Sequence, residues 1–363
     1  MKIPKSLISI NSFILITFLM PVIYMLWRFV NFSRSLSSFF QSWDVFGLLF
    51  NTIAVFIAVV ISSLIVGLLI SIVTVRFEFA GSKILFTLCA LPLVIPSYIG
   101  ALTYISAFSP KGLFVQLFNS FGLEEIAGID GFLGSWLVLT LFTYPYVQLI
   151  CSSALRNLDS TVEDAARSLG VSQLKVYTNV VIPRLKKPII YSGLLVGLYV
   201  ISDFGAVSLM RYSTVTKAIY AYYEFSILGD PVIFYSSLLI VLALIISFVQ
   251  RGSATSRSAK VSGTPRVPKK IKLERSGKML TYSFLGFVIL LGLIIPISVL
   301  SFWLLRGIYY GNDVSSSLPG IFGSFSAAIV TSIFAIIISM PIVILISQYL
   351  SLIHISEPTR QDS

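Results

Sequence analysis

The sequence predicts an all-α fold, a polytopic bundle of about eight transmembrane helices, and three observations lead to it. Of the 363 residues, 56% are hydrophobic and 11% are charged, whereas about 25% of a soluble domain is charged. The apolar runs 46–75 and 84–109 contain no charged side chain, and each exceeds the roughly 20 residues that a helix needs to cross a bilayer. The charged residues lie mainly between such runs. The lipid bilayer is therefore the expected environment of the chain.

The spans are expected, in order, near 6–27, 46–75, 83–108, 132–153, 188–210, 231–250, 279–305 and 321–350. The first span follows Lys2 and Lys5, as the apolar core of a signal peptide would. It is too long for such a core and lacks a small-residue cleavage site, so we expect a retained helix.

Two spans contain residues that are unusual at membrane depth. In the third span, Pro92, Pro96 and Gly100 would loosen the helix and leave carbonyl groups to be satisfied by neighbours or a cavity. In the fifth, Asp203 follows a long uncharged run. If it lies within the bilayer it is a functional candidate, and if the span ends near Ser202 it is a surface residue. The sequence leaves both alternatives open.

The segments between spans alternate in charge. Segments 154–187 and 251–278 are basic, whereas 109–131 and 203–231 are net acidic. Because Lys and Arg concentrate on the cytoplasmic side, this bias places the N-terminus and both basic segments in the cytoplasm. The net charge of +11 then reflects topology, and no nucleic-acid partner is expected. The two cysteines lie in apolar runs, so neither a disulfide nor a metal site is predicted.

The basic segment 251–278 is rich in Ser, Gly and Pro and is expected to be a cytoplasmic linker between two membrane units. The first unit is 1–250, with about six helices, and 279–352 begins a second. Several residues repeat at one offset of 276, namely Phe46, Gly47, Ser63 and Ser71 with Phe322, Gly323, Ser339 and Ser347. A second unit of equal length would bring the total to about 12 spans.

The final residues, 353–363, resemble translated sequencing-adapter DNA rather than a natural tail. We therefore expect 353–363 to be non-native and the intact protein to continue for roughly 150 to 200 residues.

Residues 160–183, STVEDAARSLGVSQLKVYTNVVIP, form a polar, helix-patterned stretch within the cytoplasmic loop 155–187. Ser160 and Glu163 match a capping box, which predicts a helix start. Gly170 suits the left-handed residue that ends a helix, and a second short helix is expected from Ser172 to the residue before Pro183. The first helix has an apolar face made of Val162, Ala165, Ala166 and Leu169. A helix lying on lipid headgroups would explain the amphipathic pattern but not its full spacing.

This stretch resembles the EAA loop of ABC importer permeases, whose pattern is EAA, three residues, Gly, nine residues and Ile-x-Leu-Pro. The matching positions are Asp164, Ala165, Ala166, Gly170, Val180, Ile182 and Pro183. Asp164 replaces the usual Glu and Glu163 lies one position early, so the sequence leaves open which carboxylate makes the family's contact.

The resemblance implies a type I ABC importer permease fold in which this loop is a coupling helix that docks into a separate ATPase subunit. The chain itself contains no G-x-x-x-x-G-K-[ST] motif. We therefore expect no enzyme activity and no cofactor on this chain, with ATP and Mg bound by the partner ATPase subunits, a homodimer. A periplasmic or lipid-anchored solute-binding protein and a bacterial inner-membrane location are also implied.

Segments 91–114, 142–159 and 199–220 resemble ferric-iron permeases, and similar permeases serve thiamine, phosphonate, polyamines or sulfate. The acidic, tyrosine-rich segment 203–231 supplies the oxygen ligands that ferric iron prefers, although an aromatic belt at the interface explains the tyrosines equally well. Candidate residues of the translocation pathway are Pro96, Tyr98, Gly100 and Asp203. The rival hypothesis is an ion-coupled secondary transporter in which Asp203 is the coupling carboxylate. A channel or scaffold would leave the EAA pattern unexplained.

Overall fold

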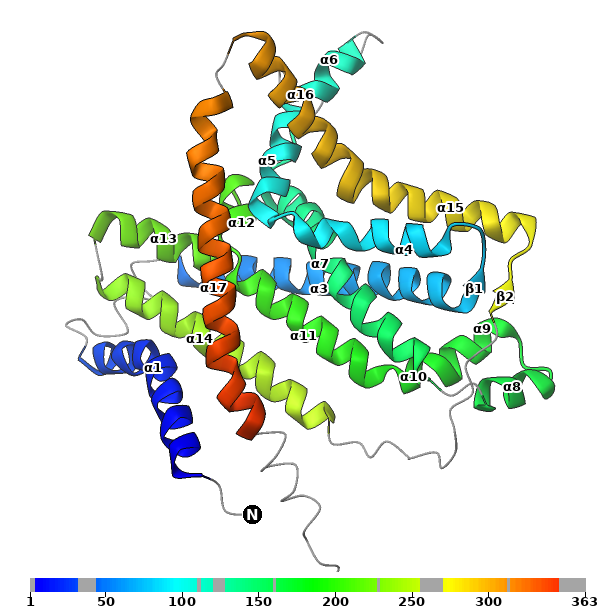
Figure 1. The fold of residues 1–363 in the computed structure, drawn as a ribbon, viewed down its shortest axis with the longest axis horizontal. Helices are drawn as coiled ribbons and strands as arrows, with labels where there is room; N and C mark the ends of the chain where they lie inside the picture. Colours follow the sequence, from blue (N-terminus) through cyan, green and yellow to red (C-terminus); the bar gives the residue numbers. More distant parts are fainter. Residues whose placement is uncertain are drawn as a thin grey trace, which may run out of the picture. The chain divides into compact units, whose positions relative to one another are not determined.

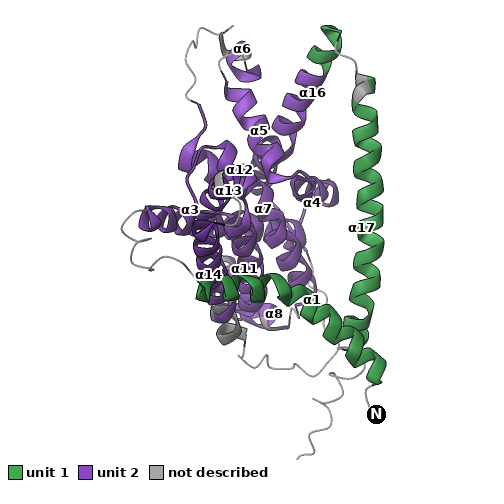
Figure 2. Cartoon of the chain, turned by 90° about the vertical axis from the view of Figure 1, so that its left-hand side faces the viewer, with its two compact units in different colours: residues 1–32, 305–363 green, residues 33–304 purple. Residues whose placement is uncertain are grey.

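The computed structural model describes residues 4–31, 44–109, 112–119, 128–158, 161–226, 229–254, 270–311 and 314–345. Over these ranges the chain is almost wholly helical (Figure 1), which confirms the all-α prediction. Contacts divide it into two compact units, residues 1–32 with 305–363 (unit 1) and residues 33–304 (unit 2), which Figure 2 shows in green and purple.

Six helical stretches are long and apolar enough to cross a membrane, and two bent pairs raise the number to as many as eight within the described residues. The six are α1 (Lys5–Val30), α3 (Val45–Arg76), α7 (Gly131–Arg156), most of α14 (Asp230–Ala254), the stretch from α15 (Arg275–Ile289) through η3 (Leu290–Ile294) to α16 (Ile295–Tyr309), and α17 (Leu318–Ile344). The predicted polytopic bundle of about eight spans is thus confirmed. The shorter elements η4 (Val314–Ser317) and α6 (Leu113–Asn119) lie between longer helices.

The third predicted span is broken rather than continuous. It consists of α4 (Ser82–Ala90), the 3₁₀ turn η1 (Leu91–Val94) and α5 (Ser97–Phe108). The stretch that ends at Val94 and the stretch that begins at Ser97 are bent by 95° relative to each other. Pro92 lies in η1, and Pro96 is the residue before α5. Neither proline can donate a backbone hydrogen bond, so the helix ends and restarts between them.

The fifth span ends earlier than predicted. Helix α11 (Lys186–Ser202) stops at Asp203 and is followed by α12 (Gly205–Leu209) and α13 (Val215–Ser226), so the expected span 188–210 is corrected to end at Ser202. The Asp203 carboxylate accepts a hydrogen bond of 2.9 Å from the amide of Ala206, in the first turn of α12. This side-chain hydrogen bond competes with continuation of α11.

The core of unit 2 is built from α3, α7 and α11, which pack closely because small residues face one another. A Cβ atom on Gly67 would lie 2.7 Å from the Tyr144 carbonyl oxygen, so α3 and α7 approach at a distance that only glycine allows. The hydroxyls of Ser63 and Thr143 lie 2.9 Å apart across this interface, and Ser71 donates to the Gln148 carbonyl over 2.9 Å. These hydrogen bonds satisfy polar groups where water is excluded.

The first helix after the predicted linker packs into the same unit. Leu285 and Leu293 belong to a buried cluster with Ile70 of α3 and Cys89 of α4. The π-helical turn η3 presents the Leu291 carbonyl to the Tyr104 hydroxyl, which donates to it over 2.7 Å. The two compact units are defined by packing. The predicted membrane units 1–250 and 279–352 and the linker 251–278 are defined by a sequence repeat, so these boundaries stay a prediction. Segment 353–363 lies outside the described residues.

Two short strands were not anticipated from the sequence. Strand β1 (Phe77–Glu78) directly follows α3, and it pairs in parallel with β2 (Ile271–Lys272), with Phe77 opposite Ile271. This pairing attaches the segment before α15 to the end of α3.

Unit 1 contains α1 and α17, and neither helix has a buried residue. The Asn11 side chain of α1 donates to the Pro341 carbonyl of α17 over 3.3 Å. The exposed Phe, Ile and Leu side chains of both helices suit a lipid surrounding.

Candidate functional site

The predicted coupling loop forms α8 (Thr161–Ser168), α9 (Gln173–Val176), the π-helical turn η2 (Tyr177–Val181) and α10 (Ile182–Arg184). Gly170 has φ +78°, which confirms the predicted left-handed end of the first helix. The Gly170 amide donates to the Arg167 carbonyl at 2.9 Å and the Val171 amide to the Ala166 carbonyl at 3.2 Å. This pair of hydrogen bonds is a Schellman motif, which fixes the angle between α8 and the segment that follows.

The carboxylate that lies one position early in the motif is buried. Glu163 is 1% exposed and pairs over 2.7 Å with the guanidinium of Arg76, which is 2% exposed and is the last residue of α3. Arg167, one turn along α8, approaches the other Glu163 oxygen to 3.8 Å. Burial raises the pKa of the Glu163 carboxyl, and the Arg76 guanidinium opposes the rise. The predicted capping partner, Ser160, lies outside the described residues.

The motif carboxylate itself faces solvent. The Asp164 side chain is 59% exposed, and of the apolar face Ala165 and Leu169 are exposed, Leu169 by 83%, while Ala166 is half-buried. The side chain of Val162 lies outside what the structure describes. A short helix that exposes leucine and alanine beside a carboxylate is suited to contact with another protein.

The second half of the loop is anchored. Tyr177, Val181 and Leu185 form a buried cluster with Leu155 from the last turn of α7. The predicted end of this helix before Pro183 is wrong, because α10 carries the helix on to Arg184. The π turn explains the continuation: the Ile182 amide donates to the Tyr177 carbonyl, which widens the helix immediately before the residue that lacks an amide hydrogen. Of the other motif positions, Val180 and Ile182 are half-buried and Pro183 is exposed.

The candidate pathway residues meet at the break in the third span. The Ser97 hydroxyl, directly after Pro96, donates to the Asp203 carboxylate. Tyr98 is half exposed, and a Cβ atom on Gly205 would lie 2.6 Å from the Tyr98 Cβ atom, so α5 and α12 are in close contact.

Asp203 therefore lies at the end of α11, partly buried, with its carboxylate held by α5 and α12. Gly100 faces inward, where a Cβ atom would collide with the ring of Phe142. Sequence reasoning missed Ser97, and its one signal was a hydroxyl directly after a proline break. Among the described residues, no three His, Cys, Asp or Glu side chains are grouped so that they could hold a metal ion.

Comparisons with a family model and with known permease proteins agree with one another. The family described as "Binding-protein-dependent transport system inner membrane component" matches residues 63–256, just over half of the chain. The "Fe(3+)-transport system permease protein FbpB 2" of Haemophilus influenzae is 27% identical over 332 residues, which cover 89% of this chain and 62% of that protein.

Other relatives match over shorter stretches. The "Sulfate transport system permease protein CysT" of Salmonella typhimurium is 29% identical over 43% of this chain and 54% of its own length. The "Putrescine transport system permease protein PotI" of Escherichia coli is 35% identical over 36% of this chain and 44% of its own length. The chain thus spans between about two fifths and three fifths of the length of these relatives.

Among solved structures, a chain of a bacterial alginate ABC transporter in complex with a periplasmic protein superposes with a TM-score of 0.56 at 14% identity. The match covers 69% of this chain and 92% of that one. At this identity the likeness shows the fold alone.

Proposed function

Because the chain belongs to the family of binding-protein-dependent transport system inner membrane components, we propose that it is the membrane-spanning permease subunit of an ATP-driven importer. The observation that carries this proposal is the α8–α10 loop, which exposes Asp164, Ala165 and Leu169 at one end and is anchored to the membrane helices at the other. A joint between two proteins needs such a division, since one surface must bind the partner and the other must pass on its movement.

The route of this movement follows from the contacts. A partner ATPase subunit would bind the exposed face of α8 and shift it when ATP closes the ATPase dimer. The Glu163–Arg76 pair would pass the shift to α3, and the cluster around Tyr177 and Val181 would pass it to α7. Since α3 packs along α7 and α11 through glycines and hydroxyl pairs, these helices would move together rather than separately.

The partners follow from the same role. ATP and Mg would bind to the ATPase subunits, and this chain would hold no cofactor. A solute-binding protein would deliver the cargo at the opposite membrane face, with the N-terminus and the α8–α10 loop in the cytoplasm and the chain in a bacterial inner membrane.

We propose ferric iron as the cargo, because the Fe(3+) permease relative matches along 89% of the chain, whereas the sulfate and putrescine relatives match 43% and 36%. The pathway would pass the α5–α12 contact, where Ser97 and Asp203 offer oxygen atoms to a hard cation. Tyr98 at the same contact offers a half-exposed phenol.

The test is uptake into proteoliposomes that contain the permease, its ATPase subunits and the loaded solute-binding protein. We expect ferric-iron uptake that requires ATP and is absent when the ATPase is omitted, with sulfate and putrescine as competing cargoes. Uptake driven by an ion gradient without ATP would refute the importer role and favour the secondary transporter. ATP-dependent uptake of sulfate or putrescine would keep the importer and refute the iron assignment.

A further inference from the structure

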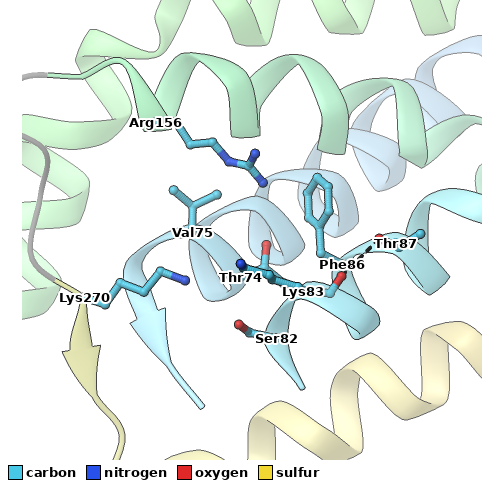
Figure 3. Close-up of a pocket in the computed structure, with 8 residues that line it drawn as sticks. All are labelled: Thr74, Val75, Ser82, Lys83, Phe86, Thr87, Arg156 and Lys270. Atoms are coloured by element: carbon cyan, nitrogen blue, oxygen red, sulfur yellow. Dashed lines mark hydrogen bonds between the residues drawn. The ribbon is translucent and has the colours of Figure 1, made fainter. Parts of the chain in front are cut away.

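A cavity of about 390 Å³ lies in unit 2 where the ends of α3, α4 and α7 meet the segment before β2. Figure 3 shows its lining, with Arg156 extending from the end of α7 toward Phe86 and Lys270 extending from the segment before β2 toward Val75. The lining residues are Thr74, Val75, Ser82, Lys83, Phe86, Thr87, Arg156 and Lys270. Neither the α8–α10 segment nor the candidate pathway residues contribute to its lining.

The charge of this cavity has one sign. Lys83, Arg156 and Lys270 line it, and the lining includes no Asp or Glu. Within the described part of the chain, none of the three forms an ion pair with a carboxylate. The Arg156 guanidinium lies over the Phe86 ring, 5.0 Å from its centroid, which holds it at the cavity wall. Three cations brought together without an acid favour an anionic ligand.

Two further features point to phosphate. The Ser82 hydroxyl lines the same cavity and can donate a hydrogen bond to a phosphate oxygen, whereas the Thr74 and Thr87 hydroxyls donate to the carbonyls of Ile70 and Lys83. The nine-residue helix α4 begins at Ser82, so the positive end of its dipole adds to the three cations.

The position of the cavity indicates where that phosphate comes from. Arg156 is the last residue of α7, and Val75 directly precedes the last residue of α3. Both helices are long and apolar enough to span a membrane, so their ends lie at the level of the lipid headgroups. Ile84, one residue beyond Lys83, is 66% exposed, which provides an apolar surface for acyl chains beside the cations.

We infer that this cavity binds the phosphate group of an anionic phospholipid from the leaflet that surrounds the α8–α10 end of the bundle. A bound headgroup bridges α4, α7 and the segment that leads into β2, which are separate segments of the chain. It also lies next to the residues that precede Arg76, the partner of Glu163.

The test compares two triple variants of the full chain, each missing three positive charges. The first is Lys83→Gln with Arg156→Gln and Lys270→Gln. The matched control is Lys272→Gln with Arg275→Gln and Lys278→Gln, three cations at the same end of unit 2 that do not line the cavity. Each protein is purified from nanodiscs of phosphatidylcholine with a minor share of phosphatidylglycerol, and native mass spectrometry counts the lipid that stays bound.

We expect wild type and control to retain phosphatidylglycerol and the cavity variant to lose affinity on the order of 100-fold, since each cation contributes roughly fivefold. Equal loss in both variants would show general electrostatics and overturn the inference. A parallel arm adds inorganic phosphate at millimolar concentration. Displacement of the lipid by free phosphate would overturn the lipid source and assign the cavity to a soluble anion.

A second measurement does not depend on folding of a triple variant. Ser82→Cys places a thiol in the cavity wall, and the native thiols, Cys89 and Cys151, are both buried. We expect phosphatidylglycerol, but not phosphatidylcholine alone, to slow the reaction of this thiol with an uncharged maleimide, a reagent that the charge of the leaflet itself does not repel. Equal rates in the two lipids would contradict a bound headgroup.

Discussion

Replacement of Glu163 by alanine should release α8 from the membrane helices while leaving the bundle folded. In the native structure the Glu163 carboxylate and the Arg76 guanidinium pair over 2.7 Å with both side chains almost fully buried. Removal of the carboxylate leaves a buried guanidinium opposite a second cation, Arg167, which had approached the same carboxylate. An unpaired buried charge is costly, so α8 should leave this surface to let water reach Arg76.

The size of the effect follows from the burial. Breaking a buried ion pair costs about 3 to 5 kcal/mol, and exposures of 1% and 2% leave little solvent to screen the pair. The lower end applies because Arg76 is the last residue of α3, and a long side chain at a helix end can extend toward the membrane surface. A cost of about 3 kcal/mol corresponds to roughly a 100-fold increase in the open fraction of α8. Glu163→Gln should have a smaller effect, because its amide oxygen still accepts a hydrogen bond from Arg76.

The assay is amide hydrogen exchange of peptides that cover 161–170, in nanodiscs and without the ATPase, since exchange reports local opening. We expect faster exchange in the order wild type, Glu163→Gln, Glu163→Ala, with peptides of α3 and α7 unchanged. The matched control is Asp164→Ala, which removes a neighbouring but exposed carboxylate and should leave exchange within about threefold of wild type. Equal exchange in Glu163→Ala and Asp164→Ala would refute the reasoning.

Three further predictions address the loop and the core. Gly170→Val should leave insertion intact but reduce ATPase stimulation by loaded binding protein severalfold, because a β-branched residue at φ +78° is strained; full stimulation at matched protein levels would defeat this idea. Asp164→Lys should weaken association with the ATPase subunit by reversing an exposed charge, and unchanged co-purification would count against it. Gly67→Val should lower the yield of folded protein, because α7 atoms lie 2.6 to 2.9 Å from the position of the new Cβ atom. The control Gly286→Ala, where no atom lies within 4 Å of the new Cβ position, should not lower the yield. Equal size-exclusion profiles for the two variants would contradict this prediction.

The sequence by itself determined the features that depend on one residue and its near neighbours. Apolar runs predicted the membrane-spanning helices, because a charged side chain in hydrocarbon is costly whatever the rest of the fold. Gly170 predicted the left-handed turn and Pro96 the weakness of the third span, because glycine and proline limit the backbone in any context. The EAA spacing likewise marked the loop without any knowledge of its contacts.

Only the tertiary structure decided which polar groups meet across long stretches of sequence. Glu163 resembles a capping residue until packing brings it to Arg76. The sequence leaves Asp203 either at membrane depth or at the end of a span, and only the structure shows that α11 ends before it and that α5 brings Ser97 to it. Four separate segments supply the basic cavity, one of them through a two-residue strand that no pattern predicted. The physical reason is that hydropathy and backbone preference act locally, whereas an ion pair or a cavity exists only once close packing has fixed which side chains can reach each other.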